Sequence, residues 1–204
     1  MGRGLSYILI IGGLVIAGSG LYSLWTSREG EKQAEEQWEA QMAQRPEPPT
    51  QVIRTPRGET LARLSIQRLD SRWAVVEGAD KTELQRAPGH LIDSALPGAS
   101  GNCVIAGHRD TQFRVLRNVE IGEDISVEAG GRTYIYRVTD RRVVAPTDTR
   151  SLDPTPTPTL TLVTCYPFYY IGPAPKRFVI RAELVSSRAG SLLNRLRTRA
   201  VQLG

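Results

Sequence analysis

The chain opens with a long apolar run and then becomes polar. Residues 5–25 contain no charged side chain, and this length matches a helix that crosses the hydrocarbon core of a membrane. A cleaved signal peptide has a shorter apolar region that ends in small residues. Small residues do occur at 17–20, but the apolar run continues past them to Trp25. We predict a cytoplasmic N-terminus at residues 1–4 and an uncleaved transmembrane signal anchor at 5–25. Arg3 lies at the N-terminal flank of this segment, so the positive-inside rule places the N-terminus in the cytoplasm and the chain after residue 25 outside it.

The next segment, residues 26–58, is polar throughout. It is rich in Glu and Gln up to Gln44 and then contains four prolines, a pattern typical of a charged helical piece followed by an extended linker. We interpret it as a stalk. The C-terminal tail, residues 187–204, carries leucines among arginines. A basic amphipathic helix on a membrane surface is compatible with this pattern, but we favour a frayed helix outside the domain.

Between these segments, residues 59–186 show short runs of alternating apolar and polar positions. Such runs, separated by Pro and Gly, predict short β-strands and a closed or nearly closed β-barrel. The expected strands are residues 61–66, 74–77, 102–106, 133–144, 160–164 and 177–185, with short helical turns near 82–86 and 113–118. On the last strand, Phe178, Ile180, Ala182 and Leu184 fall on one side.

Composition and charge argue against several classes of function. The 204 residues suffice for one compact domain with appendages. The net charge of +5 comes from dispersed arginines, with only three lysines. No basic cluster is interleaved with aromatics, which argues against nucleic-acid binding. The two cysteines define no disulfide framework, and no His/Cys group has zinc spacing. We expect neither a metal nor a cofactor.

Three reactive side chains stand at the ends of predicted strands. His108 follows an apolar run, Cys165 ends another, and Arg177 opens a third after a loop rich in aromatics and proline. Adjacent strands of a barrel would bring the three together. A thiolate is an effective nucleophile, an imidazole can activate it and protonate a departing amine, and a guanidinium suits a developing oxyanion. From spacing alone, Cys165 as a small core residue remains open.

Four sequence blocks resemble those of one enzyme family, in the family's order. TLVTC resembles the TLxTC signature of sortases, GNCVIAGHRDTQF the stretch with their catalytic histidine, and KRFVIRAEL the strand with their arginine. VVEGAD with APGHLIDSALPG resembles their early strands and connecting loop. HRDTQF and TCYPF look most like class D sortases and Gram-negative relatives. The resemblance implies an all-β fold: an eight-stranded sortase-type barrel with short helices, preceded by one transmembrane helix.

The same resemblance implies a two-step transpeptidation. Cys165 would attack a carbonyl within the C-terminal sorting motif of a secreted protein, His108 would act as acid and base, and Arg177 would stabilise the oxyanion. The acceptor would be an amine of a cell-envelope component or of another protein. Thr164 would contact the substrate. Asp110 is a further candidate beside the substrate, orienting His108 or Arg109, although a solvated loop carboxylate is the alternative.

Cys103 differs from the family pattern, and His90 has no part in the proposed reaction. Cys103 lies where the family often has an aliphatic residue, and we interpret it as a packing residue, with a redox partner of Cys165 as the alternative. His90 is expected to hold a loop. The scarcity of lysine favours a GC-rich genome and a Gram-negative host, with the enzyme on the inner membrane and its domain in the periplasm.

Rival functions make different predictions from the same residues. Papain-like enzymes place their cysteine before their histidine, whereas here His108 precedes Cys165. L,D-transpeptidases keep a His/Gly/Cys cluster near the nucleophile, and the residues around Cys165 do not match it. A non-catalytic, membrane-anchored peptide-binding barrel is the alternative from a different class. It predicts that a Cys165→Ala protein keeps its biological activity.

Overall fold

The computed structural model describes residues 32–33, 36–37, 40, 55–169 and 172–189. The predicted anchor at 5–25, most of the stalk and the tail from residue 190 onward lie outside this part. Within the described residues, no helix combines the length and apolarity that a membrane span requires.

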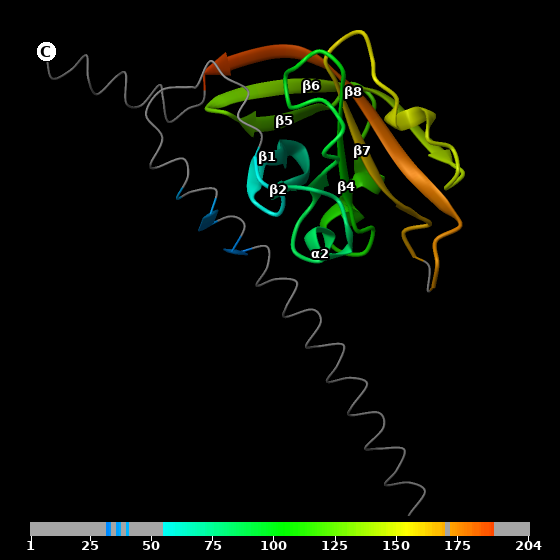
Figure 1. Cartoon of the computed structure of the whole chain (residues 1–204). Helices are drawn as coiled ribbons and strands as arrows, with labels where there is room; N and C mark the ends of the chain where they lie inside the picture. The colour runs from blue at the N-terminus through cyan, green and yellow to red at the C-terminus, as the bar shows by residue number, and fades with distance from the viewer. Residues whose placement is uncertain (1–31, 34–35, 38–39, 41–54, 170–171, 190–204) are drawn as a thin grey trace, which may run out of the picture.

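Eight strands of the described chain close into a barrel, which confirms the predicted all-β class and the strand number (Figure 1). Around the barrel the order is β1-β2-β3-β4-β7-β8-β6-β5. The strands are β1 (Thr60–Ile66), β2 (Ser71–Glu77), β3 (Gly89–His90), β4 (Asn102–Gly107), β5 (Asp124–Ala129), β6 (Arg132–Val144), β7 (Thr159–Tyr166) and β8 (Lys176–Ala189). Short helices connect them: η1 (Gln67–Leu69), α2 (Lys81–Leu84), η2 (Gln112–Asn118) and η3 (Arg150–Leu152).

Inward-facing apolar side chains from the strands fill the interior of the barrel. On β1, every second residue from Thr60 to Ile66 is buried, and on β8 the buried Phe178, Ile180 and Ala182 fall on the predicted side. The core cluster also includes large side chains from β5, β6 and η2, such as Ile125, Tyr136 and Phe113. Each fully buried aliphatic side chain contributes about 1.5–3 kcal/mol, so the barrel interior supplies most of the stabilisation.

The arrangement of β4, β7 and β8 determines where polar side chains can meet. β4 and β7 pair in parallel, so their carboxyl ends lie at the same end of the barrel. β8 pairs antiparallel with β7 and therefore starts at that end. Residues that follow β4, end β7 and begin β8 are consequently neighbours in space, although they are far apart in the sequence.

Two strands were not predicted from the sequence. β5 carries Asp124, Ser126 and Glu128 on its outer face, so only half of its residues are apolar. β3 contains two residues and pairs in parallel with β2 and antiparallel with β4. Such a short strand has no periodicity that a sequence pattern can reveal. The predicted helical turns at 82–86 and 113–118 correspond to α2 and η2.

Candidate active site

Cys165 lies between His108 and Arg177 on adjacent strands. In the parallel pair of β4 and β7, Gly107 is the partner of Thr164, so the next residues, His108 and Cys165, are neighbours. In the antiparallel pair of β7 and β8, Cys165 is directly opposite Arg177. The structure therefore brings together the three residues that the sequence indicated as a reactive group.

All three side chains face outward from the barrel. Leu160 and Leu162 on β7 and Phe178 on β8 are buried in the core, and successive strand residues point to opposite faces. Cys165 and Arg177 therefore project from the outer face. His108 is exposed, while Cys165 and Arg177 are partly exposed. A substrate can approach the Cys165 thiol without opening the barrel.

The guanidinium of Arg177 is held by the loop that precedes it. Its Nη1 donates to the carbonyls of Lys176 and Ala174, at 3.0 and 3.3 Å. Its Nε and Nη2 have no hydrogen-bond partner among the described residues, and no carboxylate there neutralises its charge. A permanently charged donor with free N–H groups beside a thiol is suited to an oxyanion or a substrate carbonyl.

The backbone of His108 is fixed on both sides. Its N–H donates to Oε1 of the buried Gln112 at 3.1 Å, and its carbonyl accepts from the N–H of Phe113 at 2.9 Å. The Phe113 ring packs so closely on Gly107 that a Cβ at this glycine would meet it at 2.8 Å. Sequence reasoning missed Gln112. Its signal was a single amide side chain directly before an apolar residue of η2.

Thr164 and Asp110 occupy different environments. Thr164 is buried, and its hydroxyl donates to the carbonyl of Gly107 at 2.7 Å. This bond ties the end of β7 to the end of β4 and thereby holds Cys165 beside His108. Asp110 is exposed in the turn after β4, and no hydrogen bond joins it to His108 or Arg109 in the described part of the chain. Contacts of either residue with substrate stay predictions.

Aromatic side chains begin directly after the nucleophile position. Tyr166 and Phe168 meet edge to face with ring centroids 5.9 Å apart, and Phe168 meets Phe178 at 5.4 Å. Tyr166 also stacks on Phe178 at 6.4 Å. This cluster closes the end of the barrel beneath Cys165. It gives the β7–β8 loop an apolar base, which restricts water on that side of the site.

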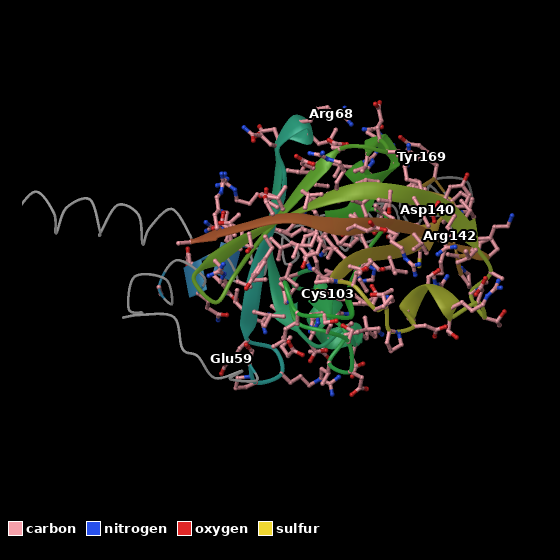
Figure 2. The ribbon with its side chains drawn as sticks, turned by 90° about the horizontal axis from the view of Figure 1, so that it is seen from above. Glu59, Arg68, Cys103, Asp140, Arg142 and Tyr169 are labelled. Atoms are coloured by element: carbon pink, nitrogen blue, oxygen red, sulfur yellow. The ribbon has the colours of Figure 1, made fainter. Side chains whose placement is uncertain are left out.

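Cys103 cannot pair with Cys165 in this fold. Both cysteines are free, and Cys103 lies inside the barrel (Figure 2). It is the partner of Leu160 on β7, five residues before Cys165, which corresponds to roughly 16 Å along a strand. A disulfide requires Cα atoms within about 7 Å. Burial also raises the pKa of the Cys103 thiol, which keeps it protonated.

His90 holds a loop, as predicted. Its ring lies in the interior, with Nδ1 3.1 Å from Oε2 of Glu77 and Nε2 3.0 Å from the carbonyl of Ala95. Ser94 Oγ is 2.9 Å from the same Nε2. These contacts fasten the β3–β4 connection to β2. His90 is therefore separate from the Cys165 site.

A polar hollow of about 930 Å³ lies elsewhere on the barrel surface. It is lined by side chains from β1, β2, β5, β6 and the far end of β8, including Arg72, Glu128 and Arg188. It contains neither of the cysteines nor His108. The described residues also include no group of His, Cys, Asp and Glu arranged to hold a metal ion.

Comparisons with known proteins agree with this geometry. The sortase domain family matches residues 64–185. A sortase D of Bacillus subtilis (strain 168) is 33% identical over 130 residues, which cover 63% of this chain and 66% of that protein. The chain thus spans about two thirds of the length of this curated relative.

Solved structures show the same fold. A sortase D5 transpeptidase of Clostridium perfringens has a TM-score of 0.64 at 22% identity, covering 79% of this chain and 99% of the other. Sortase E1 of Streptomyces coelicolor, solved with a tripeptide in the active site, has a TM-score of 0.59 at 27% identity. That match covers 65% of this chain and 91% of the other.

Proposed function

Because the chain belongs to the sortase family, whose members are cysteine transpeptidases, we propose that it is a class D-like transpeptidase with Cys165 as its nucleophile. The observation that carries the proposal is the strand register. In this register Cys165 is beside His108, which directly follows β4, and opposite Arg177 on β8, with all three on the outer face. A cysteine with only a packing role would not explain why His108 and Arg177 lie beside it.

The reaction proceeds through two steps at one thiol. The Cys165 sulfur forms a bond to the scissile carbonyl carbon while Arg177 donates to the carbonyl oxygen as it gains charge. His108 protonates the departing amine, which leaves a thioacyl enzyme. In the second step an amine attacks the thioacyl carbon, the carbon–sulfur bond breaks, and His108 accepts the proton released by the amine.

The donor in this proposal is a secreted protein with a C-terminal sorting motif, and the acceptor is an amine of a cell-envelope component or of another protein. A tripeptide occupies the active site of the Streptomyces coelicolor enzyme, which supports a peptide donor here. The exposed position of His108 supports an acceptor that arrives from solvent. The sequence motif of the donor awaits a peptide library.

An adduct experiment tests the assignment of Cys165. The full chain in detergent micelles, under reducing conditions, is incubated with a library of candidate sorting peptides, and intact mass spectrometry detects the acyl adduct. We expect an adduct with the wild type and with Cys103→Ala, and none with Cys165→Ala. His108→Ala and Arg177→Ala should lower kcat/KM by about 100-fold or more.

Two outcomes would count against the proposal. An acyl adduct on Cys165→Ala would move the nucleophile to another residue. No adduct with any peptide, together with full biological activity of Cys165→Ala, would favour the non-catalytic peptide-binding barrel.

We also propose that the enzyme is a single-pass protein of the inner membrane, with its domain in the periplasm of a Gram-negative cell. The uncharged run at residues 5–25 and the lysine-poor, arginine-rich composition support this placement. A phosphatase fused after residue 204 should be active, because it requires export to fold. An inactive fusion that is present in full length would contradict the orientation.

A further inference from the structure

Two arginines contact the exposed ring of Tyr169, and a third, Arg141, contacts the backbone of one of them and the ring of Phe178. The guanidinium of Arg117 lies 5.0 Å from the ring centroid of Tyr169, and that of Arg114 lies 5.6 Å from it. Arg141 donates from Nη2 to the carbonyl of Arg117 at 3.1 Å and lies 5.6 Å from the Phe178 ring. We call Arg114, Arg117, Arg141 and Tyr169 the arginine surface.

These arginines lack the carboxylate partners that other arginines of the chain have. Arg68, Arg137 and Arg150 each form an ion pair with an acidic side chain. Among the described residues, no carboxylate lies within 4 Å of the guanidinium of Arg114, Arg117 or Arg141. Asp140 is adjacent in sequence to Arg141, but it pairs with Arg142 at 3.2 Å.

Two nitrogens of the arginine surface are shielded from solvent without a hydrogen-bond acceptor. These are Nη1 of Arg117 and Nε of Arg141. Leaving a charged donor shielded and unpaired is unfavourable, and like charges this close repel one another. An anionic group bound at the exposed side of these guanidinium groups would offset the repulsion between them.

Short chain segments connect the arginine surface to the catalytic residues. Tyr169 lies four residues after Cys165, and η2, which carries Arg114 and Arg117, begins four residues after His108. Figure 2 shows Tyr169 at the same end of the barrel as Asp140 and Arg142, the two neighbours of Arg141. The segments that leave the two catalytic strands therefore meet again in a positively charged surface.

We propose that the arginine surface binds the acceptor, and that the acceptor is an amine that also carries a carboxylate. This inference rests on the proposed transpeptidase function. An acceptor must compete with water for the thioacyl carbon, so binding through charge raises its local concentration and orients its amine. The departing segment of the donor gains nothing from tight binding, because it must leave before the acceptor enters.

The transfer step then follows from the charges. The arginine surface holds the carboxylate through charge-assisted hydrogen bonds. The lone pair of the acceptor nitrogen forms a bond to the thioacyl carbon, and the carbon–sulfur bond breaks with its electrons returning to Cys165. His108 takes the proton that the nitrogen loses, which restores the thiolate and imidazolium pair.

A matched pair of acceptors tests the inference. The full chain in detergent, acylated by the donor peptide found in the adduct experiment, receives either glycyl-glutamate amide or glycyl-glutamine amide, which differ in charge but hardly in shape. We expect the glutamate acceptor to react with about tenfold higher kcat/KM at low salt, as one charge-assisted contact provides. The preference should shrink at high salt.

Variants locate the preference on the surface. In Arg114→Gln with Arg117→Gln, the ratio of the two acceptors should fall close to one, whereas Arg132→Gln should keep the wild-type ratio. Arg132 is exposed and forms no ion pair with a described residue, but it is the partner of Ala189, at the far end of β8 from Arg177. Arg114→Gln alone, at an exposed position, should lower the ratio in part and replaces the double variant where that variant folds poorly.

The outcomes separate this inference from the proposed function. Absence of a thioacyl adduct refutes the transpeptidase itself. A normal adduct with equal use of both acceptors, or a preference that survives in the double variant, overturns only the role of the arginine surface. A last experiment compares donor peptides that have Glu or Gln directly after the scissile bond. If the enzyme prefers the Glu donor but uses the two acceptors equally, the arginine surface binds the departing segment of the donor instead.

Discussion

At the scale of single residues, the two cysteines occupy opposite sides of the same sheet. Cys165 projects outward between His108 and Arg177, and Cys103 points into the core. A thiol without water around it stays protonated, and the pKa of Cys103 is raised for this reason. Position in the strand pleat therefore decides which of two identical side chains can react.

A thiol count in the native state should reflect this difference. With a maleimide or a disulfide reagent at neutral pH, the native wild type should react at one cysteine, and the denatured protein at two. Native Cys165→Ala should show no rapidly reacting thiol, and native Cys103→Ala should show one. Rapid reaction of Cys103 in the native protein would contradict its burial.

Gln112 is a positioning residue that acts through His108. Its side-chain oxygen accepts from the backbone N–H of His108, and its amide donates to the carbonyl of Leu84 at 3.4 Å. Gln112→Leu should lower kcat about tenfold or more with little change in KM, because a small displacement of a catalytic group is costly. Gln112→Glu keeps the acceptor oxygen and should retain more activity than Gln112→Leu.

The separate effects on kcat and KM distinguish positioning from general instability. In Gln112→Leu, kcat should fall while KM and the melting temperature stay close to those of the wild type. Thermal melts followed by circular dichroism provide the control for folding. A loss of activity that tracks the melting temperature would reduce Gln112 to a packing residue.

At the scale of elements, a buried asparagine joins the catalytic strands to the β6–β7 connection. Nδ2 of Asn102 donates to the carbonyls of Ser151 and Asp153, at 3.0 and 3.1 Å. Its Oδ1 accepts from the Thr161 hydroxyl at 2.7 Å. One side chain thus links β4, β7 and the segment around η3, which lies along the outer face that carries Cys165.

Removal of this side chain should be costly. Asn102→Ala leaves the Asp153 carbonyl and the Thr161 hydroxyl without this partner, and leaves the Ser151 carbonyl with only the 3.5 Å bond from Arg181. We expect a loss of about 3 kcal/mol in the free energy of unfolding. Urea denaturation measures it. Asn118→Ala is the matched control, because Asn118 is exposed, and it should change stability by less than about 0.5 kcal/mol. Equal effects of the two variants would contradict the linking role of Asn102.

Sequence patterns predicted the strands that are continuous apolar runs or long alternating segments, and missed β5, whose alternation includes only three apolar residues. The strands that hold the buried Leu64, Ile105, Leu162 and Ile180 were all predicted, and so was the arrangement of His108, Cys165 and Arg177 at strand ends. β3 escaped because two residues have no period. Gln112 escaped because its importance lies in one tertiary hydrogen bond to His108, which no local pattern encodes.

At the scale of the whole molecule, the barrel contains its own core. Every buried residue of the main core cluster lies between Ala62 and Ala182. The pairing of β1 with β5 closes the barrel, so every strand of the barrel has a neighbour on both sides. Of the described residues that precede β1, none belongs to this cluster.

A truncated chain should therefore fold as well as the full one. We expect residues 51–204 and the full chain, measured in the same detergent and urea series, to differ by less than about 0.5 kcal/mol in free energy of unfolding. Ile105→Ala in each form is the control, since loss of this buried side chain should cost about 2–5 kcal/mol in both. If truncation alone destabilised the barrel by as much as Ile105→Ala, the N-terminal segment would be part of the folded domain. Its role would then extend beyond holding the enzyme at a membrane, because the stability of the barrel, and with it the geometry around Cys165, would depend on it.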